Sequence, residues 1–354
     1  MIPQSNLGIP LGTGPVYFNH VKIANFSVFH MHTWRKAATR NKSPIALTIG
    51  NFDGVHLGHQ AILARLKEAA RTANLPAHVM TFEPHPREFF APDQAPARLT
   101  SLREKMKYLR KADVDGIHIC RFNFDFARIS PEQFITRILK QELAVRWLLI
   151  GDDFRFGARR AGDFELLQSL SAASQFEVEV MPSITIDQHR VSSTGIREAL
   201  ASGDLTVARK LLGRPYSICG RVVDGDKLGK QIGFPTANIQ LKYFRPALSG
   251  IFVVAVHGAI ASSPAAVLPG VASLGVRPTV QENGKPVLEV HLFDFNDEIY
   301  GQHLQVDFLH KLRDEEKYAD IDSLVSQIEK DVSAAKDFFN STRAISASHA
   351  QPFN

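Results

Sequence analysis

Two histidines separated by a glycine-containing turn are the residues whose types and spacing most directly suggest chemistry. His56 and His59 lie three residues apart in the segment G-N-F-D-G-V-H-L-G-H, residues 50–59. Side chains at that spacing share one face of a helical turn, and Gly58 removes a side chain where a phosphate would come close. Two imidazoles at a helix N-terminus, neutral or cationic, suit the negative charge that develops on an α-phosphate during nucleotidyl transfer. A helix cap with two solvated histidines is the alternative.

The sequence on either side of this segment predicts a strand before it and a helix after it. The apolar run 45–49 is typical of a buried strand, and residues 60–74 place apolar side chains at helical spacing. In an open parallel sheet, ligands bind where strands end and helices begin, because free N–H groups and the helix dipole attract anions there. This context favours phosphate binding over a simple cap.

A second candidate phosphate site opens another expected helix, in the segment V-S-S-T-G-I-R, residues 191–197. The hydroxyls of Ser193 and Thr194 and the guanidinium of Arg197 could hold the β- and γ-phosphates of a nucleotide. The alternative is that the hydroxyls only cap the helix and that Arg197 is an ordinary exposed arginine. Because both motifs stand at helix starts, phosphate binding is favoured.

Two loops follow the expected strands 77–82 and 146–150. The first, T-F-E-P-H-P (residues 81–86), is forced into an extended path by its prolines and should face the same cleft as the histidines. His85 within it is more readily explained as a packing residue than as a catalytic one. The second, G-D-D-F-R-F-G (residues 151–157), brackets acidic and aromatic residues with glycines. It suits a pocket for a base and ribose, or it is an ordinary loop.

The second half of the chain carries different candidates. The segment G-D-K-L-G-K, residues 225–230, is one residue short of a Walker loop and is followed by Gln231 rather than a hydroxyl residue. Its glycines permit close backbone approach to phosphates. In the adjoining G-F-P-T-A-N string, Thr236 and Asn238 offer oxygen ligands of the kind that Mg²⁺ prefers, although a rigid turn is the alternative.

Glu289 is the acidic candidate of this half. In the segment E-V-H-L-F-D-F, residues 289–295, strand geometry places Glu289, His291 and Phe293 on one face. A glutamate among apolar residues needs a partner or a task, unless it lies on an exposed face of the strand.

The pattern of expected elements predicts two different folds. Strands alternate with helices to about residue 200, which predicts an α/β, doubly wound, Rossmann-like domain with a parallel sheet and without a P-loop. From Tyr216, apolar runs follow one another without helices, which predicts a small antiparallel β-barrel, and residues 321–339 form a final amphipathic helix. The expected divisions are a poorly ordered extension over 1–25, one domain over 26–205 and another over 206–345.

Composition bounds the class of protein. Of the 354 residues, 44% are apolar and 22% charged, as in ordinary globular proteins. The net charge of +5 suits anionic substrates, and its scattered Lys and Arg form no nucleic-acid stripe. Cys120 and Cys219 make no disulfide framework, which indicates a reducing compartment. No run reaches the length of a membrane span and no secretory signal is present, so we expect a cytoplasmic protein with neither membrane nor nucleic-acid partners.

These motifs together resemble those of the bacterial bifunctional riboflavin kinase/FMN adenylyltransferases, also called FAD synthetases. The resemblance runs from about Ile45 to Phe339, with the motifs in the family's order. It implies that the barrel phosphorylates riboflavin with ATP to FMN and that the amino-terminal domain transfers AMP from a second ATP to FMN, giving FAD and pyrophosphate. It also implies Mg²⁺ for both steps, the small molecules riboflavin, FMN and ATP as partners, and a monomer or weak homo-oligomer.

The resemblance assigns roles residue by residue. Glu289 would be the general base for the riboflavin 5′-hydroxyl, His56 and His59 would act in adenylyl transfer, and Thr236 and Asn238 would bind the metal. The nucleotide-binding set would be Gly50, Asn51, Phe52, Asp53, Gly54, Gly58, Asp153, Ser193, Thr194, Arg197, Gly225, Gly229, Gly233, Thr236 and Asn238. The flavin-binding set would be Phe82, Pro84, Pro86, Phe154, Phe156 and Arg313. One departure is Ser273, where many members carry Asn beside a G-V-R-P-T loop.

Two other classes of function compete with this interpretation. A nucleic-acid-binding barrel is permitted by the basic pI, but it would carry a basic stripe interleaved with aromatic residues, which the sequence lacks. A flavin-binding sensor with one inactive module is the other alternative. What argues against it is the retention of His56, His59, Arg197, Thr236, Asn238 and Glu289.

Overall fold

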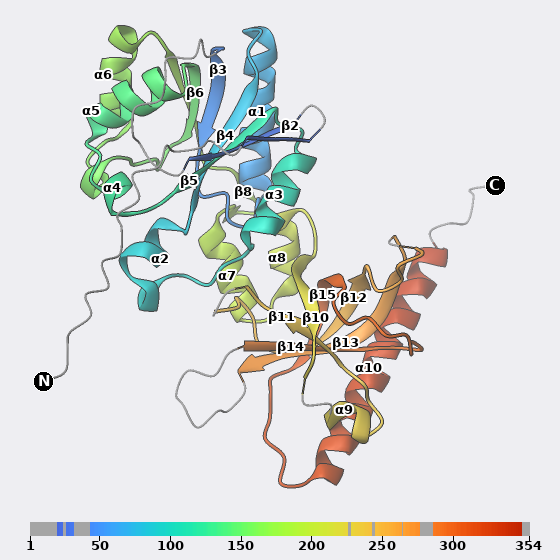
Figure 1. The fold of residues 1–354 in the computed structure, drawn as a ribbon. Coiled ribbons are helices and arrows are strands. Elements are labelled where there is room, and N and C mark those ends of the chain that lie inside the picture. The colour runs from blue at the N-terminus through green and yellow to red at the C-terminus, as the bar shows by residue number, and fades with distance from the viewer. Residues whose placement is uncertain are drawn as a thin grey trace, which may run out of the picture. The chain divides into compact units, whose positions relative to one another are not determined.

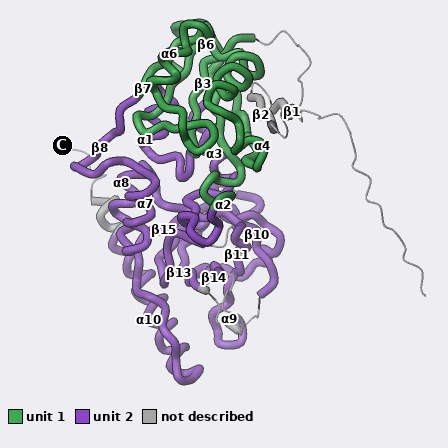
Figure 2. The backbone as a smooth tube through the Cα atoms, turned by 90° about the vertical axis from the view of Figure 1, so that its left-hand side faces the viewer, with its two compact units in different colours: residues 1–51, 65–90, 114–180 green, residues 52–64, 91–113, 181–354 purple. Residues whose placement is uncertain are grey.

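The structure, a computed structural model, describes residues 20–23, 26–31, 43–225, 228–242, 245–263, 265–276 and 286–348. The chain divides into two compact units, which Figure 2 distinguishes by colour. The first comprises residues 1–51, 65–90 and 114–180, and the second comprises residues 52–64, 91–113 and 181–354. The segment that carries both histidines therefore belongs to the same unit as the carboxyl-terminal half of the chain.

The first unit is built on a seven-stranded sheet with the order β1-β2-β5-β4-β3-β6-β7. Its strands are β1 (His20–Ile23), β2 (Phe26–Met31), β3 (Ile45–Ile49), β4 (Ala77–Glu83), β5 (Gly116–Arg121), β6 (Val145–Gly151) and β7 (Glu177–Met181). The pairs β2–β5, β5–β4, β4–β3 and β3–β6 are parallel, and β1 pairs with β2 antiparallel. The expected parallel α/β sheet is confirmed.

Strand β1 lies inside the segment 1–25 for which the sequence predicts no order. It forms because the edge of β2 offers unpaired backbone groups, which the four residues of β1 satisfy in antiparallel register. The remaining residues of that expected extension, 1–19 and 24–25, lie outside the described residues.

Helices of the amino-terminal part connect these strands. They are α1 (Leu57–Thr72), α2 (Pro86–Phe90), η1 (Pro92–Gln94), α4 (Phe124–Ala127), α5 (Pro131–Gln133) continuing into the π-helical η2 (Phe134–Glu142), η3 (Ala158–Arg160) and α6 (Phe164–Ser174). Leu47 and Leu148 of the sheet share one buried core with Ile135 of η2 and Leu167 of α6. These two helical elements therefore cover one face of the sheet, where Figure 1 shows α5 and α6 beside β6.

Besides η1 and the first half of α1, the second unit contains further helices and a short hairpin before its barrel. They are α3 (Leu102–Lys111), β8 (Thr185–Ile186), β9 (His189–Arg190), α7 (Ser193–Ala201) and α8 (Leu205–Leu212). The strands β8 and β9 are only two residues long each. Asp187 and Gln188 adopt left-handed φ values of 48° and 66° and turn the chain back after two residues.

The rest of the second unit is a closed six-stranded antiparallel barrel, as expected. Its order is β10-β11-β14-β13-β12-β15. The strands are β10 (Tyr216–Val223), β11 (Ala237–Gln240), β12 (Gly250–His257), β13 (Val267–Val276), β14 (Pro286–Leu292) and β15 (His303–Arg313). Alternate residues such as Val254, Leu274 and Leu288 fill the interior. Closure leaves no free edge in this sheet.

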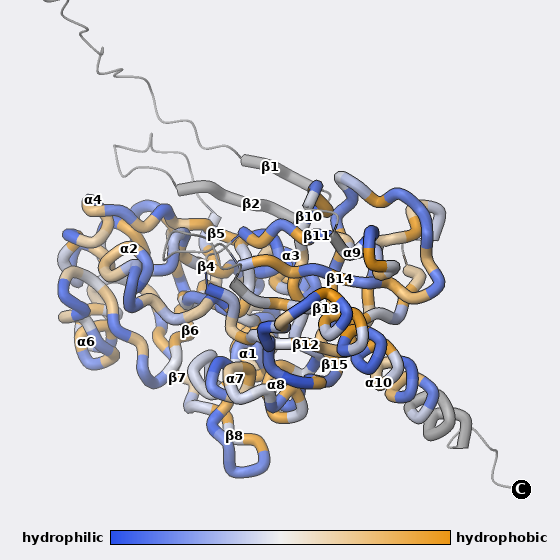
Figure 3. Tube along the Cα trace, turned by 90° about the horizontal axis from the view of Figure 1, so that it is seen from below, coloured by the Kyte–Doolittle hydropathy of each residue, from blue (hydrophilic) through white to orange (hydrophobic). Residues whose placement is uncertain are grey.

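A long helix, α10 (Ile321–Ser348), packs on the outside of the barrel and confirms the expected carboxyl-terminal helix. Its fully buried Ala335 contacts a cluster formed by Val253, Val271 and Phe293. Hydrophobic and hydrophilic residues alternate along α10 in Figure 3, as an amphipathic helix requires. The short helix α9 (Leu228–Gln231) falls in the glycine-containing loop between β10 and β11.

Candidate active sites

The loop between β3 and α1 is strained just before the first histidine. Phe52, Gly54 and Val55 have left-handed φ values of 47°, 82° and 39°. For a β-branched residue such as Val55 this is a genuine outlier. Strain of this kind persists only where the surrounding structure fixes it, and it clusters at functional sites.

The carboxylate of Asp53 ties this loop to two distant segments. It accepts hydrogen bonds from the backbone N–H of Leu99 (3.1 Å) and from both the N–H and the hydroxyl of Thr100 (2.9 and 3.0 Å). It also pairs with the Arg197 guanidinium at 2.5 Å, and both side chains are largely buried. The Asp53 carboxylate is thus engaged with the backbone and side chains of other segments of the second unit, and its predicted contact with a nucleotide stays a prediction.

Hydrogen bonds from other segments also fix the backbone of the loop between β3 and α1. The Gly54 N–H donates to Thr100 Oγ1 at 3.0 Å, and Gln60 Nε2 donates to the Val55 carbonyl at 3.0 Å. Arg214 donates to the carbonyl oxygens of both Gly54 and Val55. Since each of these groups is anchored elsewhere in the second unit, the strained conformation is fixed by its surroundings.

The two histidine rings stack on each other, with centroids 3.7 Å apart and planes 17° from parallel. The backbone N–H of His59 donates to His56 Nδ1 at 3.3 Å. Burial lowers the pKa of His56 from 6.5 to about 4, with Asp53 opposing and Arg214 and Arg197 adding to the shift. The His56 ring is therefore neutral at pH 7, and because Nδ1 accepts, its proton lies on Nε2.

His59 is neutral for the same reason. Burial lowers the pKa of His59 well below its usual range, and nearby His56 and Lys105 lower it further. The His59 Nδ1 atom is sealed from solvent without a hydrogen-bond partner among the described residues. The pair thus supplies neutral imidazoles rather than the cationic donors that the sequence left open.

Gly58 is required by the histidines themselves. A Cβ at this position would stand 3.1 Å from His56 Nδ1 and 3.3 Å from the Val191 carbonyl. Both approaches are tighter than ordinary van der Waals contact, so a larger residue would press His56 out of place.

The second candidate phosphate site, residues 191–197, contacts the first, residues 50–59. Ser193 Oγ donates to the Asp53 carbonyl at 3.0 Å, and Arg197 Nε donates to the Ala97 carbonyl at 2.6 Å in addition to its ion pair. The helix cap is Ser192, whose hydroxyl accepts from the Gly195 N–H at 3.1 Å. Thr194 is exposed. The structure therefore brings Ser193 and Arg197 into contact with the loop that carries His56 and His59.

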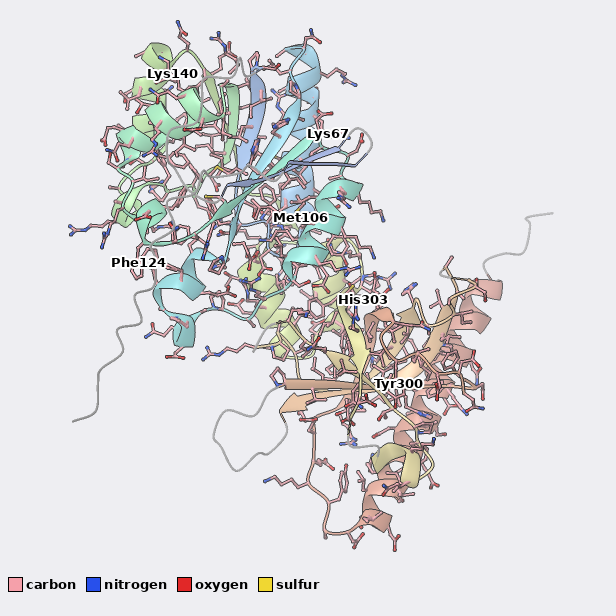
Figure 4. All side chains as sticks on the ribbon, in the orientation of Figure 1. Lys67, Met106, Phe124, Lys140, Tyr300 and His303 are labelled. Carbon is pink, nitrogen blue, oxygen red and sulfur yellow. The ribbon has the colours of Figure 1, made fainter. Side chains whose placement is uncertain are left out.

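In the first unit, the predicted flavin-binding phenylalanines belong to an aromatic cluster. Phe82 lies 6.0 Å from Phe122 between ring centroids, and Phe154 stacks on Phe156 at 5.6 Å. Phe124 of α4, labelled in Figure 4, is 65% exposed despite its size. In the sequence, phenylalanine alternates with other residues over 122–126, and this pattern is the signal from which the aromatic cluster could have been predicted.

The remaining predicted residues of the first unit occupy strand ends and loops. Gly50 N–H donates to the Met80 carbonyl, and the Asn51 carbonyl accepts from Thr81 Oγ1, which ties the ends of β3 and β4 together. Pro86 begins α2, Pro84 precedes it, and Asp153 is exposed after β6. The binding roles of Pro84, Pro86 and Asp153 stay predictions.

On the barrel, three polar residues align across neighbouring strands: the predicted metal ligand Asn238, the predicted base Glu289, and Ser273. Asn238 of β11 is the register partner of Glu289 on β14, which is in turn the partner of Ser273 on β13. All three are half-buried, whereas Leu288 and Val290 on either side of Glu289 are buried. Glu289 therefore lies on the outer, polar face of the barrel, in direct cross-strand contact distance of an amide and a hydroxyl.

The loop glycines close tightly around the predicted metal ligands. A Cβ at Gly225 would overlap the Asn238 amide, and one at Gly229 would stand 3.3 Å from Thr236 Oγ1. The Phe234 N–H donates to the Gly229 carbonyl at 2.7 Å, and Gly233 adopts a left-handed φ of 90°. Gly225 and Gly229 are thus needed for the backbone to pass close to Asn238 and Thr236.

Arg313 is engaged within the second unit. Its Nη2 lies 2.7 Å from Asp331 Oδ2 of α10, and Asp331 raises the pKa of the guanidinium. The adjoining Glu315 carboxylate accepts from Ser273 Oγ at 3.0 Å. Arg313 therefore fastens α10 to the end of β15, and its predicted flavin contact stays a prediction. Of the G-V-R-P-T segment that follows Ser273, residues 277–279 lie outside the described residues.

Comparison with known proteins assigns both halves of the chain. A family model described as FAD synthetase matches residues 38–195, and one described as riboflavin kinase matches residues 212–339. A bifunctional riboflavin kinase/FMN adenylyltransferase of Haemophilus influenzae is 50% identical over 305 residues, covering 86% of this chain and 97% of that protein. The protein of the same name from Escherichia coli K12 is 47% identical, covering 84% and 93%.

A solved structure supports the fold. A chain titled a macrolide-efflux protein of Streptococcus pneumoniae superposes with a TM-score of 0.71 at 29% identity, over 86% of this chain and 97% of that one. In the described part of this chain, no helix combines the length and apolar character needed to cross a membrane.

The two matched domains and the relatives that align over nearly their whole length lead to one assignment. The chain belongs to the bifunctional riboflavin kinase/FMN adenylyltransferase family, and it phosphorylates riboflavin to FMN and adenylylates FMN to FAD.

Proposed function

We propose that His56 and His59 are the catalytic residues of adenylyl transfer. The observation that carries this proposal is the stacked, neutral pair fixed on a strained loop. His56 would donate its Nε2–H to the α-phosphate as negative charge builds on it. The unpartnered Nδ1 of His59 would gain a hydrogen bond once a nucleotide or its water is bound. The predicted neighbours Ser193, Thr194 and Arg197 would hold the remaining phosphates.

For the kinase reaction, we propose Glu289 as the general base. It would take the proton from the riboflavin 5′-hydroxyl as that oxygen attacks the γ-phosphate of ATP. Its register next to Asn238 supports this role, because the base and a phosphate-side ligand would then be neighbours. In phosphoryl transfer, positioning and charge stabilisation supply most of the catalysis, so one aligned base is sufficient.

Thr236 and Asn238 would hold Mg²⁺ in this site. The fit is chemical: a hydroxyl and an amide oxygen, closely lined by Gly225 and Gly229, match an ion that binds few protein ligands and completes its shell with phosphates and water. When bound, the ion would neutralise polyphosphate charge. The predicted flavin residues Phe82, Pro84, Pro86, Phe154 and Phe156 would bind FMN through their apolar and aromatic surfaces.

The proposal extends to the substrates, the oligomeric state, the localisation and the domain bounds of the protein. The substrates are riboflavin, FMN and ATP, without nucleic-acid or membrane partners, and the protein is a cytoplasmic monomer or weak homo-oligomer. The functional divisions are those expected from the sequence: an extension over 1–25, an adenylyltransferase over 26–205 and a kinase over 206–345.

The test is a chromatographic assay of the full-length protein with riboflavin, ATP and Mg²⁺, in which FMN and FAD are followed separately. His59→Ala should accumulate FMN and stop there. Glu289→Ala should make no FMN from riboflavin but still convert supplied FMN to FAD. Riboflavin kinase activity that survives in Glu289→Ala would show that the assigned base is wrong.

A further inference from the structure

Arg214 binds the backbone of the strained loop from a position outside it. Its Nη2 donates to the Gly54 carbonyl at 2.5 Å, and its Nη1 donates to the carbonyls of Val55 (3.2 Å) and Leu212 (3.3 Å). A guanidinium presents its donors in a rigid planar fork. It therefore fixes the angle between two successive carbonyls, those of Gly54 and Val55, which are two of the three residues of this loop with left-handed φ values.

The guanidinium itself rests on a fixed platform. Its carbon lies 3.7 Å from the centroid of the Tyr108 ring of α3. The Tyr108 hydroxyl is hydrogen-bonded to Ser217 Oγ at 2.8 Å, and Glu104, also on α3, accepts from the Cys219 N–H at 2.6 Å. Because α3 is thus tied to β10, the stacked guanidinium cannot shift without breaking other contacts.

The strained loop is expected to relax if the hydrogen bonds from Arg214 to the Gly54 and Val55 carbonyls are lost. A non-glycine residue held in a sparsely populated backbone region is strained, and Val55 is such a residue. Val55 immediately precedes His56, so relaxation of its backbone would rotate the catalytic ring. A displacement of about 1 Å in a catalytic group is enough to cost about 100-fold in rate.

We propose that Arg214 is a positioning residue for adenylyl transfer. It holds the Gly54 and Val55 carbonyls and so sets the direction of His56 Nε2, without touching the reacting atoms. The inference rests on the catalytic role proposed for His56. It also assigns to a residue within the stretch matched by riboflavin kinase, 212–339, a duty in the other reaction of the enzyme.

The test compares Arg214→Gln and Arg214→Lys in the full-length enzyme with the matched control Arg209→Gln. Arg209 is an exposed residue of α8, five positions away, and its loss removes the same charge. For FAD formation from supplied FMN and ATP, we expect kcat to fall about 100-fold in Arg214→Gln with little change in KM. Arg214→Lys should keep part of the rate, since an ammonium can donate to the carbonyls without the planar fork. Arg209→Gln should stay within about twofold of the unchanged enzyme.

The kinase rate of each sample, measured from riboflavin and ATP, should stay within about twofold and reports intact folding. The proposal is overturned if Arg214→Gln keeps its FAD-forming kcat within about threefold, or if both Arg214 variants lose the two activities in parallel. His56→Ala, measured alongside, separates the two levels. If His56→Ala loses FAD formation and Arg214→Gln does not, only the positioning role fails. If His56→Ala retains FAD formation, the role of His56 fails as well.

Discussion

The two proposed sites of the second unit rest on opposite kinds of backbone. The histidine loop is irregular, with three left-handed residues before His56, and side chains from several distant segments hold it. The Glu289 row is regular: Asn238, Glu289 and Ser273 face one another through ordinary antiparallel register. Hydrogen bonds between residues far apart in the sequence build the histidine site, whereas the regular pairing of neighbouring strands, a β-ladder, builds the Glu289 site.

This difference predicts different sensitivities. In a ladder, each side chain is positioned by its own strand, so replacing one residue removes its chemistry and leaves its neighbours in place. In an over-determined loop, replacing a remote partner releases strain at the catalytic residue. Mutations far from the chemistry should therefore harm adenylyl transfer more than they harm the kinase reaction.

The largest effect should come from Glu289→Gln. The amide keeps the size and the strand register of the carboxylate but cannot accept a proton, so FMN formation should fall by about 10²–10⁴. Steady-state rates from riboflavin measure this loss, and FAD formation from supplied FMN should be unchanged. Glu298→Gln, an exposed position in the loop after β14, is the control. Equal losses in both variants would contradict the assigned base.

Asp53→Asn probes the loop at its most connected residue. The amide cannot pair with Arg197 or accept all the bonds that the carboxylate accepts, so we expect FAD formation to fall about 100-fold, with a lowered melting temperature. The kinase rate of the same sample should change little. The exposed Asp93→Asn supplies the charge control. A stable Asp53→Asn enzyme with full FAD synthesis would show that the loop does not depend on this carboxylate.

A pair of histidines in the first unit, His78 and His118, should make stability depend on pH. His78 Nδ1 lies 2.9 Å from His118 Nε2, and burial lowers the pKa of His78 from 6.5 to about 4. The unfolded chain then binds more protons between those values, so stability is lost as pH falls from about 6.5 toward 4. The expected loss between pH 7 and 5 is on the order of 2 kcal/mol. Denaturant titrations should show a shallower dependence in His78→Gln, and an identical slope would refute the assignment.

Gly58→Ala should give the smallest of these effects. The added methyl would press on the His56 ring at 3.1 Å, so the ring must give by a few tenths of an ångström. We expect roughly a tenfold loss in FAD-forming kcat with an unchanged kinase rate. A larger increase in KM for ATP than decrease in kcat would indicate instead that the methyl blocks the phosphate, as the sequence alone suggested.

The sequence predicts the paired strands around Glu289 better than it predicts the loop that carries His56 and His59. Alternation around Glu289 and the run of β-like segments after Tyr216 are local patterns, and both are confirmed as strands of a barrel. His56 and His59 are also identified by type and spacing. Their neutrality and Nε2 protonation, however, depend on burial that spacing does not reveal.

The partners of the loop could not be predicted, because they act across long stretches of chain. Thr100 follows an unremarkable segment, and Arg214 stands between Gly213 and Pro215, where it resembles an ordinary turn residue. The role of Asp53 as an internal anchor was likewise hidden, since a carboxylate in a glycine-rich loop is equally consistent with ligand binding. Arg313 shows the same limit, because its ion pair with Asp331 joins elements that the sequence does not place together.

The central claim, that the loop holds two neutral histidines in a fixed orientation, is tested most directly by nuclear magnetic resonance of the imidazole nitrogens. The full-length protein would be labelled with ¹⁵N-histidine, and the His56 and His59 signals assigned by difference against His56→Gln and His59→Gln. The account predicts that both rings are neutral at pH 7, that His56 carries its proton on Nε2, and that neither titrates near pH 6.5. A His56 signal that titrates near 6.5, or one protonated on Nδ1, would contradict it.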